Sequence, residues 1–411
     1  MKHSPKHTIL RAGALRDAAG TDLSPGSVLI QSGRIAAVGH PDDMPSDLVG
    51  EVRVIDRSDH LILPQMVNAH THLELTDIGP RPYDPVGGFV GWVQQIRAHA
   101  PTTDSARRAA LQRGAAMARR AGVFAVGDVA SSIPLADARR DAGLLGTSYL
   151  ELFGLGSPFD RDALDALGAI ERADDGLQPH APYSAGPSLF AAAAKSGKPV
   201  STHLAETVEE SRFVGQGDGP WLDYLRSIGR WDDAFEQHVG QGLSPVQWMR
   251  PHLRAAADRG GWLVAHCNYV GDDDLAILAE SNASVAYCPI ASEYFGHVGH
   301  RYRDMLDAGV NVCLGTDSIV GTDPRDPQQL GLISAMRRLY ERDGFDPQTL
   351  LAMATVNGAR ALRLDDPNAA TLRVGADARF IALPIDRDSS GDPLVQTLTR
   401  QDPAEAISLV A

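Results

Sequence analysis

The stretch LILPQMVNAHTHLEL, residues 61–75, decides the fold because it combines an apolar run with two histidines spaced two residues apart. Alternate side chains of a β-strand point to the same side, so the pattern places His70 and His72 on one side of a buried strand. In a (β/α)8 barrel, side chains at the carboxyl end of a strand face the catalytic mouth. The stretch is therefore interpreted as the first strand of such a barrel, with both histidines at the rim.

Further apolar segments follow, each ending in a polar or Gly/Pro loop, and most of them precede a segment of helical spacing. They are residues 122–129, 147–154, 177–184, 199–206, 262–270, 283–290 and 311–318. This alternation predicts an α/β protein with a (β/α)8 TIM-type barrel over residues 60–368. Ser244-Pro245 and Asp346-Pro347 predict two helix starts, because a capping side chain precedes a proline of the first turn.

Both ends of the chain show β patterns instead. Residues 27–39, SVLIQSGRIAAVG, predict a hairpin around Ser32-Gly33, and residues 373–385, RVGADARFIALPI, predict another strand. We expect residues 1–59 and 369–411 to build one small β-sandwich domain. Within the barrel, residues 207–260 form the longest interruption between strands, and long βα insertions of this kind form lids or substrate walls.

Composition excludes several classes of protein. The net charge of −14 argues against a partner rich in phosphate, so we expect no nucleic acid ligand. Apolar runs stay shorter than the ~18 residues that a membrane helix needs, and the first residues lack a secretory signal pattern. We therefore expect no membrane contact and a cytoplasmic location. The cysteines, Cys267, Cys288 and Cys313, lie in apolar runs and are expected to be buried thiols.

Other strand ends supply side chains that complement His70 and His72. They are His180 on the fourth strand, His203 on the fifth, His266 on the sixth and Asp317 on the eighth. Imidazoles combined with a carboxylate are the ligands that zinc and ferrous iron prefer. We expect His70, His72, His203 and Asp317 to bind one divalent metal, with zinc favoured over iron.

A metal of this kind lowers the pKa of a bound water from about 15.7 toward neutrality. Glu206 follows His203 by three residues, so it is predicted to take the proton of that water and pass it to the substrate. His266 is predicted to orient or polarise the water, together with Asp317. The alternatives are a solvated carboxylate for Glu206 and, for His266, a hydrogen bond that holds a metal ligand in place.

Three residues are candidates for contact with the substrate. His180 and Tyr183 lie together at the end of the fourth strand, and Glu74 follows His72 by two residues. The alternatives are a supporting histidine for His180 and a rim salt bridge for Glu74. His297 and His300 are left open between pocket wall and ordinary loop.

Several segments of the chain, taken together, resemble the amidohydrolase superfamily, in particular its mononuclear deaminase and chlorohydrolase branch. Within that branch their sequences most resemble aminodeoxyfutalosine-deaminase-like members. The matching segments are NAHTHLEL (68–75), HAPYSAGP (180–187), STHLAET (201–207), VAHCNYV (264–270), YCPIAS (287–292) and LGTDS (314–318). The resemblance implies a single metal on His70, His72, His203 and Asp317, with Glu206 as the proton shuttle. It also implies that His266 contacts the hydrolytic water.

The chain departs from this resemblance at one place. Relatives often carry Ser-Asn after the proline of the YCPIAS segment, whereas this chain has Ile290-Ala291, which indicates a changed pocket contact. The binuclear branches of the superfamily bridge two metals with a carboxylated lysine or a carboxylate on the fourth strand. Here that strand offers His180 and no lysine, so the resemblance implies one metal.

The predicted function is hydrolysis of a carbon–nitrogen bond other than a peptide bond. The hypothesis is deamination of a purine-type or related heterocyclic amine by metal-bound hydroxide. The alternatives are a cyclic amide hydrolase, a chlorohydrolase and, from a different class, a non-catalytic metal-binding protein. A cytidine-type zinc deaminase is excluded because the chain has no Cys pair with the required spacing. The expected partner is a small heterocyclic substrate, and analogy with relatives suggests a homodimer.

Overall fold

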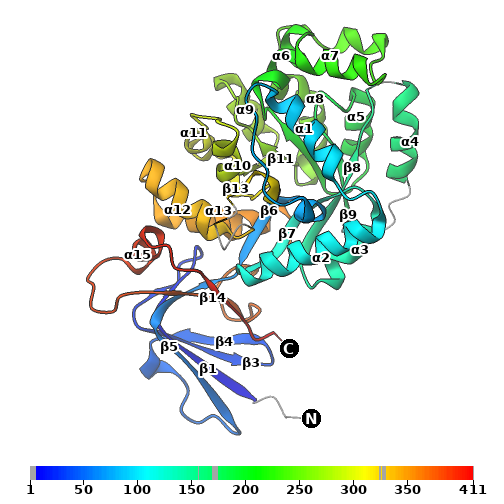
Figure 1. The fold of residues 1–411 in the computed structure, drawn as a ribbon. Coiled ribbons are helices and arrows are strands. Elements are labelled where there is room, and N and C mark those ends of the chain that lie inside the picture. The colour runs from blue at the N-terminus through cyan, green and yellow to red at the C-terminus, as the bar shows by residue number, and fades with distance from the viewer. Residues whose placement is uncertain (1–5, 156, 169–174, 324, 326–329, 411) are drawn as a thin grey trace. The chain divides into compact units, whose positions relative to one another are not determined.

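The computed structural model describes residues 6–155, 157–168, 175–323, 325 and 330–410 (Figure 1). The chain divides into two compact units, and each is described on its own. One unit comprises Met1–Asn68, Ala116–Ala125 and Pro327–Ala411, and the other comprises Ala69–Ala115 and Val126–Asp326.

The first unit contains a mixed sheet built from both ends of the chain, which confirms the prediction of a composite β domain. Its strands are β1 (His7–Arg16), β2 (Asp22–Leu23), β3 (Gly26–Gln31), β4 (Arg34–Gly39), β5 (Val52–Pro64), β14 (Arg379–Pro384) and β15 (Glu405–Ser408). The predicted hairpin is present, because β3 and β4 pair antiparallel around Ser32 and Gly33. Leu10, Val28 and Phe380 belong to its buried core. All of these strands belong to one sheet.

The predicted first barrel segment contains two strands. Strand β5 continues to Pro64 and pairs with β14, and β6 begins at Met66. Pro64 has no N–H to donate, and the N–H of Gln65 bonds to the carbonyl of Arg379. Residues 61–64 therefore belong to the mixed sheet although they continue the apolar run.

Eight strands form the second sheet in sequential order, which confirms the predicted TIM-type barrel. They are β6 (Met66–Thr71), β7 (Val123–Ala130), β8 (Leu145–Leu152), β9 (Asp175–Pro179), β10 (Val200–Leu204), β11 (Trp262–His266), β12 (Ser284–Tyr287) and β13 (Asn311–Leu314). The side chains of β10 and β11 are buried throughout. A parallel bridge joins Thr71, at the end of β6, to Asp317, after β13, and so brings the last strand back to the first.

Helices follow most of the barrel strands. In the second unit they are α1 (Gly88–His99), α3 (Ile133–Asp141), α4 (Ser157–Gly168), α5 (Pro187–Lys195), α6 (Val208–Gln216), α7 (Pro220–Ser227), α8 (Pro245–Ala256), α9 (Asp272–Glu280), α10 (Pro289–Tyr294) and α11 (Tyr302–Asp307). In the first unit they are α12 (Leu332–Asp343), α13 (Pro347–Ala354), α14 (Val356–Ala361) and α15 (Pro393–Thr399), while α2 (Asp104–Arg120) spans the division. Both predicted caps are present, because Ser244 caps α8 and Asp346 caps α13.

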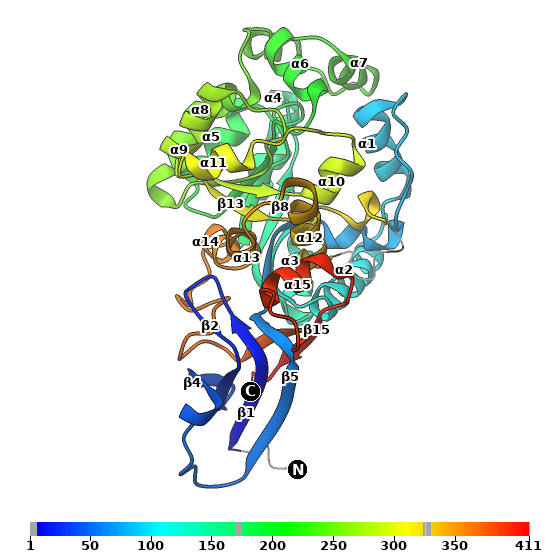
Figure 2. The ribbon, with the colours of Figure 1, turned by 90° about the vertical axis from the view of Figure 1, so that its left-hand side faces the viewer.

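The insertion between β10 and β11 folds into α6, α7 and α8. Both views place α7 beside α1 (Figure 2), and Arg97 of α1 donates a hydrogen bond of 2.8 Å to the hydroxyl of Tyr224 on α7. All three cysteines are buried free thiols, as predicted. Among the described residues, every helix is too short or too polar to pass through a lipid bilayer.

Candidate active site

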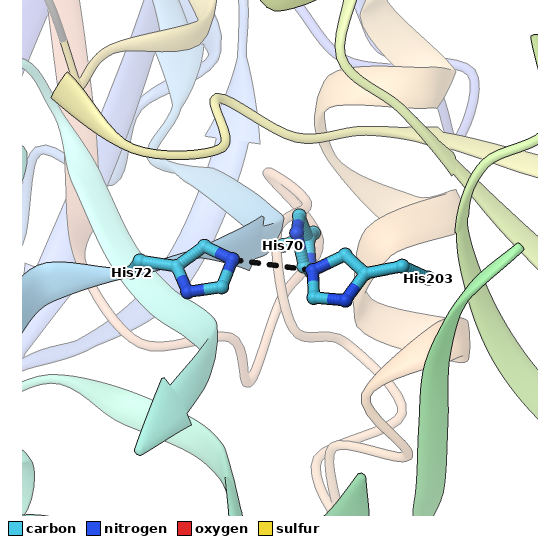
Figure 3. A group of neighbouring side chains, drawn as sticks. All are labelled: His70, His72 and His203. Atoms are coloured by element: carbon cyan, nitrogen blue, oxygen red, sulfur yellow. Dashed lines mark hydrogen bonds between the residues drawn. The ribbon is translucent and has the colours of Figure 1, made fainter. Parts of the chain in front are cut away.

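Three histidines from two barrel strands meet at the barrel mouth (Figure 3). His70 is the penultimate residue of β6, His72 lies just beyond this strand before a short 3-10 helix, and His203 lies in β10. One ring nitrogen of each lies within 4.8 Å of the others. The Nε2 atoms of His72 and His203 are 3.3 Å apart. The spacing of two along the first strand therefore brings both side chains to the same side, as the sequence predicted.

Asp317 joins this group from the far end of the barrel sheet. Its Oδ1 lies 3.5 Å from Nε2 of His72 and 3.9 Å from Nε2 of His70. The backbone holds it there, because the N–H groups of Thr316 and Asp317 both bond to the carbonyl of His70 at 3.1 Å. Asp317 also has a φ of +56°, a conformation that is concentrated at functional sites in residues other than glycine. The four residues predicted as metal ligands thus lie together.

Three observations show that this group fits a divalent cation. The Nε2 atom of His70 is buried and has no hydrogen-bond partner among the described residues. Nδ1 of His203 lies 3.0 Å from the carbonyl of His180, so it donates there and leaves the lone pair of Nε2 facing the centre. Burial lowers the pKa of His70 and His72 well below 6.5 and that of His203 to about 4, which keeps the rings in their neutral, ligating form.

Asp317 also belongs to a second group of polar side chains, together with Glu206 and His266. One potential ligand atom of each of these three residues lies within 4.8 Å of the others. Oε1 of Glu206 is 3.5 Å from Nε2 of His266. Burial, helped by the neighbouring Asp317, raises the pKa of Glu206 well above its usual value. A carboxyl group with a raised pKa can both accept and donate a proton near neutral pH.

A cavity of about 720 Å³ opens onto both groups. Its volume lies in the range of ~300 to 1,000 Å³ that is common for small-molecule sites. The predicted substrate contacts Glu74, His180 and Tyr183 all line it, together with His72, His203, Glu206, His266 and Asp317. These eight residues, all predicted from the sequence as site residues, therefore share one cavity within the second unit.

The family model of the Amidohydrolase family matches residues 61–402 of this chain. The chain belongs to the amidohydrolase family. An aminodeoxyfutalosine deaminase from Deinococcus radiodurans is 28% identical over 381 residues, which cover 86% of this chain and 85% of that protein.

Solved structures share the fold of this amidohydrolase. An aminofutalosine deaminase from Helicobacter pylori in complex with methylthio-coformycin superposes with a TM-score of 0.77 at 18% identity, covering 97% of both chains. An adenosine deaminase from Xanthomonas campestris with bound zinc gives a TM-score of 0.71 at 19% identity, covering 95% of this chain and 88% of that one. At these identities the likeness shows the fold alone.

Glu151 of this amidohydrolase is an ionisable cavity residue that was not predicted from the sequence. Glu151, near the end of β8, lines the cavity, and its Oε1 lies 3.7 Å from Nε2 of His180. Burial, together with Glu74, raises the pKa of Glu151 to about 8. The sequence did contain a signal for Glu151, because it is a carboxylate within the apolar run TSYLELFG. Like the other candidates, it lies near the carboxyl end of its strand.

Part of the cavity wall of the amidohydrolase is aromatic. Tyr183 stacks on Trp221 of α7 with ring centroids 3.9 Å apart, and Phe153 stacks on His180 at 4.8 Å. Trp221 and Tyr224 line the cavity, which confirms that the insertion after β10 forms a wall of the pocket.

The remaining candidates have defined partners. Oε2 of Glu74 accepts a hydrogen bond of 2.8 Å from the hydroxyl of Ser131. Nδ1 of His297 lies 2.9 Å from the hydroxyl of Tyr269. His300 bonds through Nε2 to the carbonyl of His266 at 2.8 Å, so it supports the strand end of the amidohydrolase barrel that carries His266.

Proposed function

We propose that this chain is a metal-dependent aminohydrolase that removes the exocyclic amino group of a purine-type nucleoside. The observation that carries the proposal is the meeting of His70, His72, His203 and Asp317 around the unpartnered Nε2 of His70, at the base of a ligand-sized cavity. These four residues would hold one divalent cation, and zinc is favoured over iron because a relative with the same fold binds zinc.

When bound, the cation supplies positive charge that makes a water molecule acidic enough to act as a nucleophile near neutral pH. Glu206 accepts one proton from the attacking water and donates it to the ring nitrogen beside the reacting carbon. As the carbon–nitrogen bond breaks, the departing amine takes up a further proton from the water and leaves as ammonia. The location of Glu206 supports this proposed role, because its Oε1 lies 3.5 Å from Nε2 of His266 and its carboxylate is grouped with that of Asp317.

Other side chains of the chain act on the nucleophile and on the substrate. His266 is held by burial in its neutral form and orients the water together with Asp317. His180, Tyr183 and Glu74 hold the heterocycle, and the aromatic rings around Trp221 cover its apolar surface. The purine class follows from the activities named for the relatives, which include deamination of aminodeoxyfutalosine and of adenosine.

The test combines metal analysis of the purified protein with an assay of ammonia release. Adenosine and adenosines substituted at the 5′ position form the substrate panel, and ammonia with the matching inosine product is the expected result. Release of halide from a chlorinated heterocycle, or of a new carboxylate from a cyclic amide, would replace deamination by the corresponding alternative. Bound metal without turnover of any of these compounds would indicate a non-catalytic metal-binding protein.

We also propose that residues 1–59 and 369–411 form a small β domain, that residues 60–368 form the hydrolase domain, and that the protein is a cytoplasmic homodimer. Limited proteolysis would locate the limits, and sedimentation of the purified protein would give the number of subunits.

A further inference from the structure

The turn between β10 and α6 carries Glu206. In this turn the backbone N–H and carbonyl groups of Ala205 and Glu206 all form hydrogen bonds. The N–H groups of Ala205 and Glu206 donate to Oε1 and Oε2 of Glu210 at 2.9 and 2.8 Å. The carbonyl of Glu206 accepts from Nδ2 of Asn268 at 2.9 Å, and the carbonyl of Ala205 accepts from the N–H of Tyr269 at 3.0 Å. The turn is therefore held from two sides.

Glu210 departs from the usual behaviour of a residue at its position. Thr207 caps α6 and accepts a hydrogen bond of 3.1 Å from the N–H of Glu210, so Thr207 and Glu210 stand at the spacing of a capping box. In a capping box, the carboxylate of the third helical residue returns to the N–H of the capping residue. Here that carboxylate reaches past Thr207 and bonds to the two residues before it. The Glu210 carboxylate therefore holds backbone that precedes the helix.

The held residues include one in an unfavourable conformation. Ala205 has a φ of +50°, which residues other than glycine rarely adopt unless the surroundings impose it. Glu210 has no exposed surface, and Asn268 is 7% exposed. The hydroxyl of Ser292 on α10 donates a hydrogen bond of 2.7 Å to Oδ1 of Asn268 and thereby orients the amide. When Glu210 is ionised, its bonds to both N–H groups are charge-assisted, and such bonds are stronger than those between neutral groups.

We propose that Glu210 is a positioning residue, which sets the location of the Glu206 carboxyl by binding the backbone of residues 205 and 206. The inference rests on the proposed role of Glu206 as the proton shuttle. Glu210 does not need to touch the substrate, because it acts through the backbone that carries Glu206. A catalytic group that moves by about 1 Å can lose roughly 10²-fold in rate.

The first experiment compares Glu210→Gln with Glu209→Gln in the metal-loaded enzyme. The side-chain amide introduced by Glu210→Gln can accept from only one of the two N–H groups and opposes the other with its own N–H, whereas Glu209 makes neither bond. We expect Glu210→Gln to lower kcat by roughly 10-fold to 10²-fold with little change in KM. Glu209→Gln should retain the wild-type kcat. A Glu210→Gln enzyme with wild-type kcat at equal metal content would overturn the proposal.

The second experiment asks whether Glu210 acts through Glu206. In a Glu206→Gln background the shuttle is already absent, so adding Glu210→Gln should cause little further loss of kcat. Full multiplication of the two losses would show that Glu210 acts by another route and would overturn the proposal. If Glu210 had only a structural role, Glu210→Gln would lower the thermal midpoint, and its effect on kcat would be the same with and without Glu206.

The third experiment does not depend on turnover. Hydrogen exchange of the peptide that spans residues 200–212 should accelerate at residues 205 and 206 in Glu210→Gln, and stay at the wild-type rate in Glu209→Gln. Unchanged exchange in Glu210→Gln would overturn the inference about the turn. If the wild type deaminates no nucleoside, the proposed function fails, and the exchange result still decides whether Glu210 holds this turn.

Discussion

Nε2 of His72 and Nε2 of His203 face each other at 3.3 Å at the barrel mouth, although the two residues lie on strands far apart in the chain. The two ring nitrogens lie at hydrogen-bond distance (Figure 3), and when a cation lies within reach of both, each can present its lone pair to that cation.

This arrangement predicts that the metal stabilises the folded state. Removing it with a chelator should abolish activity and lower the thermal midpoint, and added zinc should restore both. A ligand at 100 times its Kd contributes about 2.7 kcal/mol to the free energy of unfolding. His203→Asn should lose both the metal and this response, while His99→Asn, on the exposed end of α1, serves as the control. A thermal midpoint that ignores zinc in the wild type contradicts the prediction.

Glu206→Gln should keep the metal and lose the reaction. The amide has nearly the shape of the carboxyl, but it cannot take a proton from water and pass it on, and general acid–base help is worth ~10² to 10⁴ in rate. Metal content per chain and kcat are the two measurements. Glu236→Gln, at an exposed position of the insertion, is the matched control. If Glu206→Gln retained the wild-type kcat, another group would have to be the shuttle.

Glu151→Gln should weaken substrate binding more than it slows the chemical step. Glu151 lines the cavity beside His180 and is mostly protonated near neutral pH because its pKa is raised to about 8. A hydrogen bond between neutral groups contributes about 0.5 to 1.5 kcal/mol. We therefore expect KM to rise about 2-fold to 10-fold and kcat to stay within about two-fold of the wild type. Steady-state kinetics on the substrate that the panel identifies will check this. A fall in kcat at constant KM would instead place Glu151 in the chemical step.

Asp128 should make the stability of the protein depend on pH. Its Oδ1 accepts the N–H of Leu73 at 3.0 Å, and burial raises its pKa to about 7. An unfolded aspartate has a pKa of about 3.9, so the folded state binds more protons between these values. The contribution to stability is complete below about pH 4 and is lost as the pH rises through about 7.

Asp128→Asn should remove that slope, because the amide oxygen can still accept from Leu73 and carries no charge. The free energy of unfolding, measured by denaturant titration of both proteins from about pH 5 to about pH 8, tests this. Parallel curves for the wild type and the variant would show that Asp128 does not titrate in this window.

The barrel could be predicted because its signals are local. Each strand is a short apolar run, and the caps at Ser244 and Asp346 stand beside the helices that they start. The limit between the mixed sheet and the barrel could not be read in the same way. Residues 61–70 form one apolar run, and only the pairing of β5 with β14 shows that the sheet changes after Pro64.

The candidate site was predictable to the same extent. Histidines and an aspartate at strand ends stand out because burying such polar groups costs free energy unless they are hydrogen-bonded, paired or bound to a metal. Glu210 did not stand out, since its spacing from Thr207 is that of an ordinary capping box and only the fold shows where its carboxylate points. Glu151 had a signal in sequence, but its closeness to His180 depends on the neighbouring positions of β8 and β9.

The bridge between Thr71 and Asp317 has a consequence for biosynthesis. The first half of the ligand set leaves the ribosome long before the last member, because 244 residues lie between residues 72 and 317. We therefore expect the cation to bind late, after β13 has docked. A growing chain that stops before residue 311 should leave the ribosome without its ion.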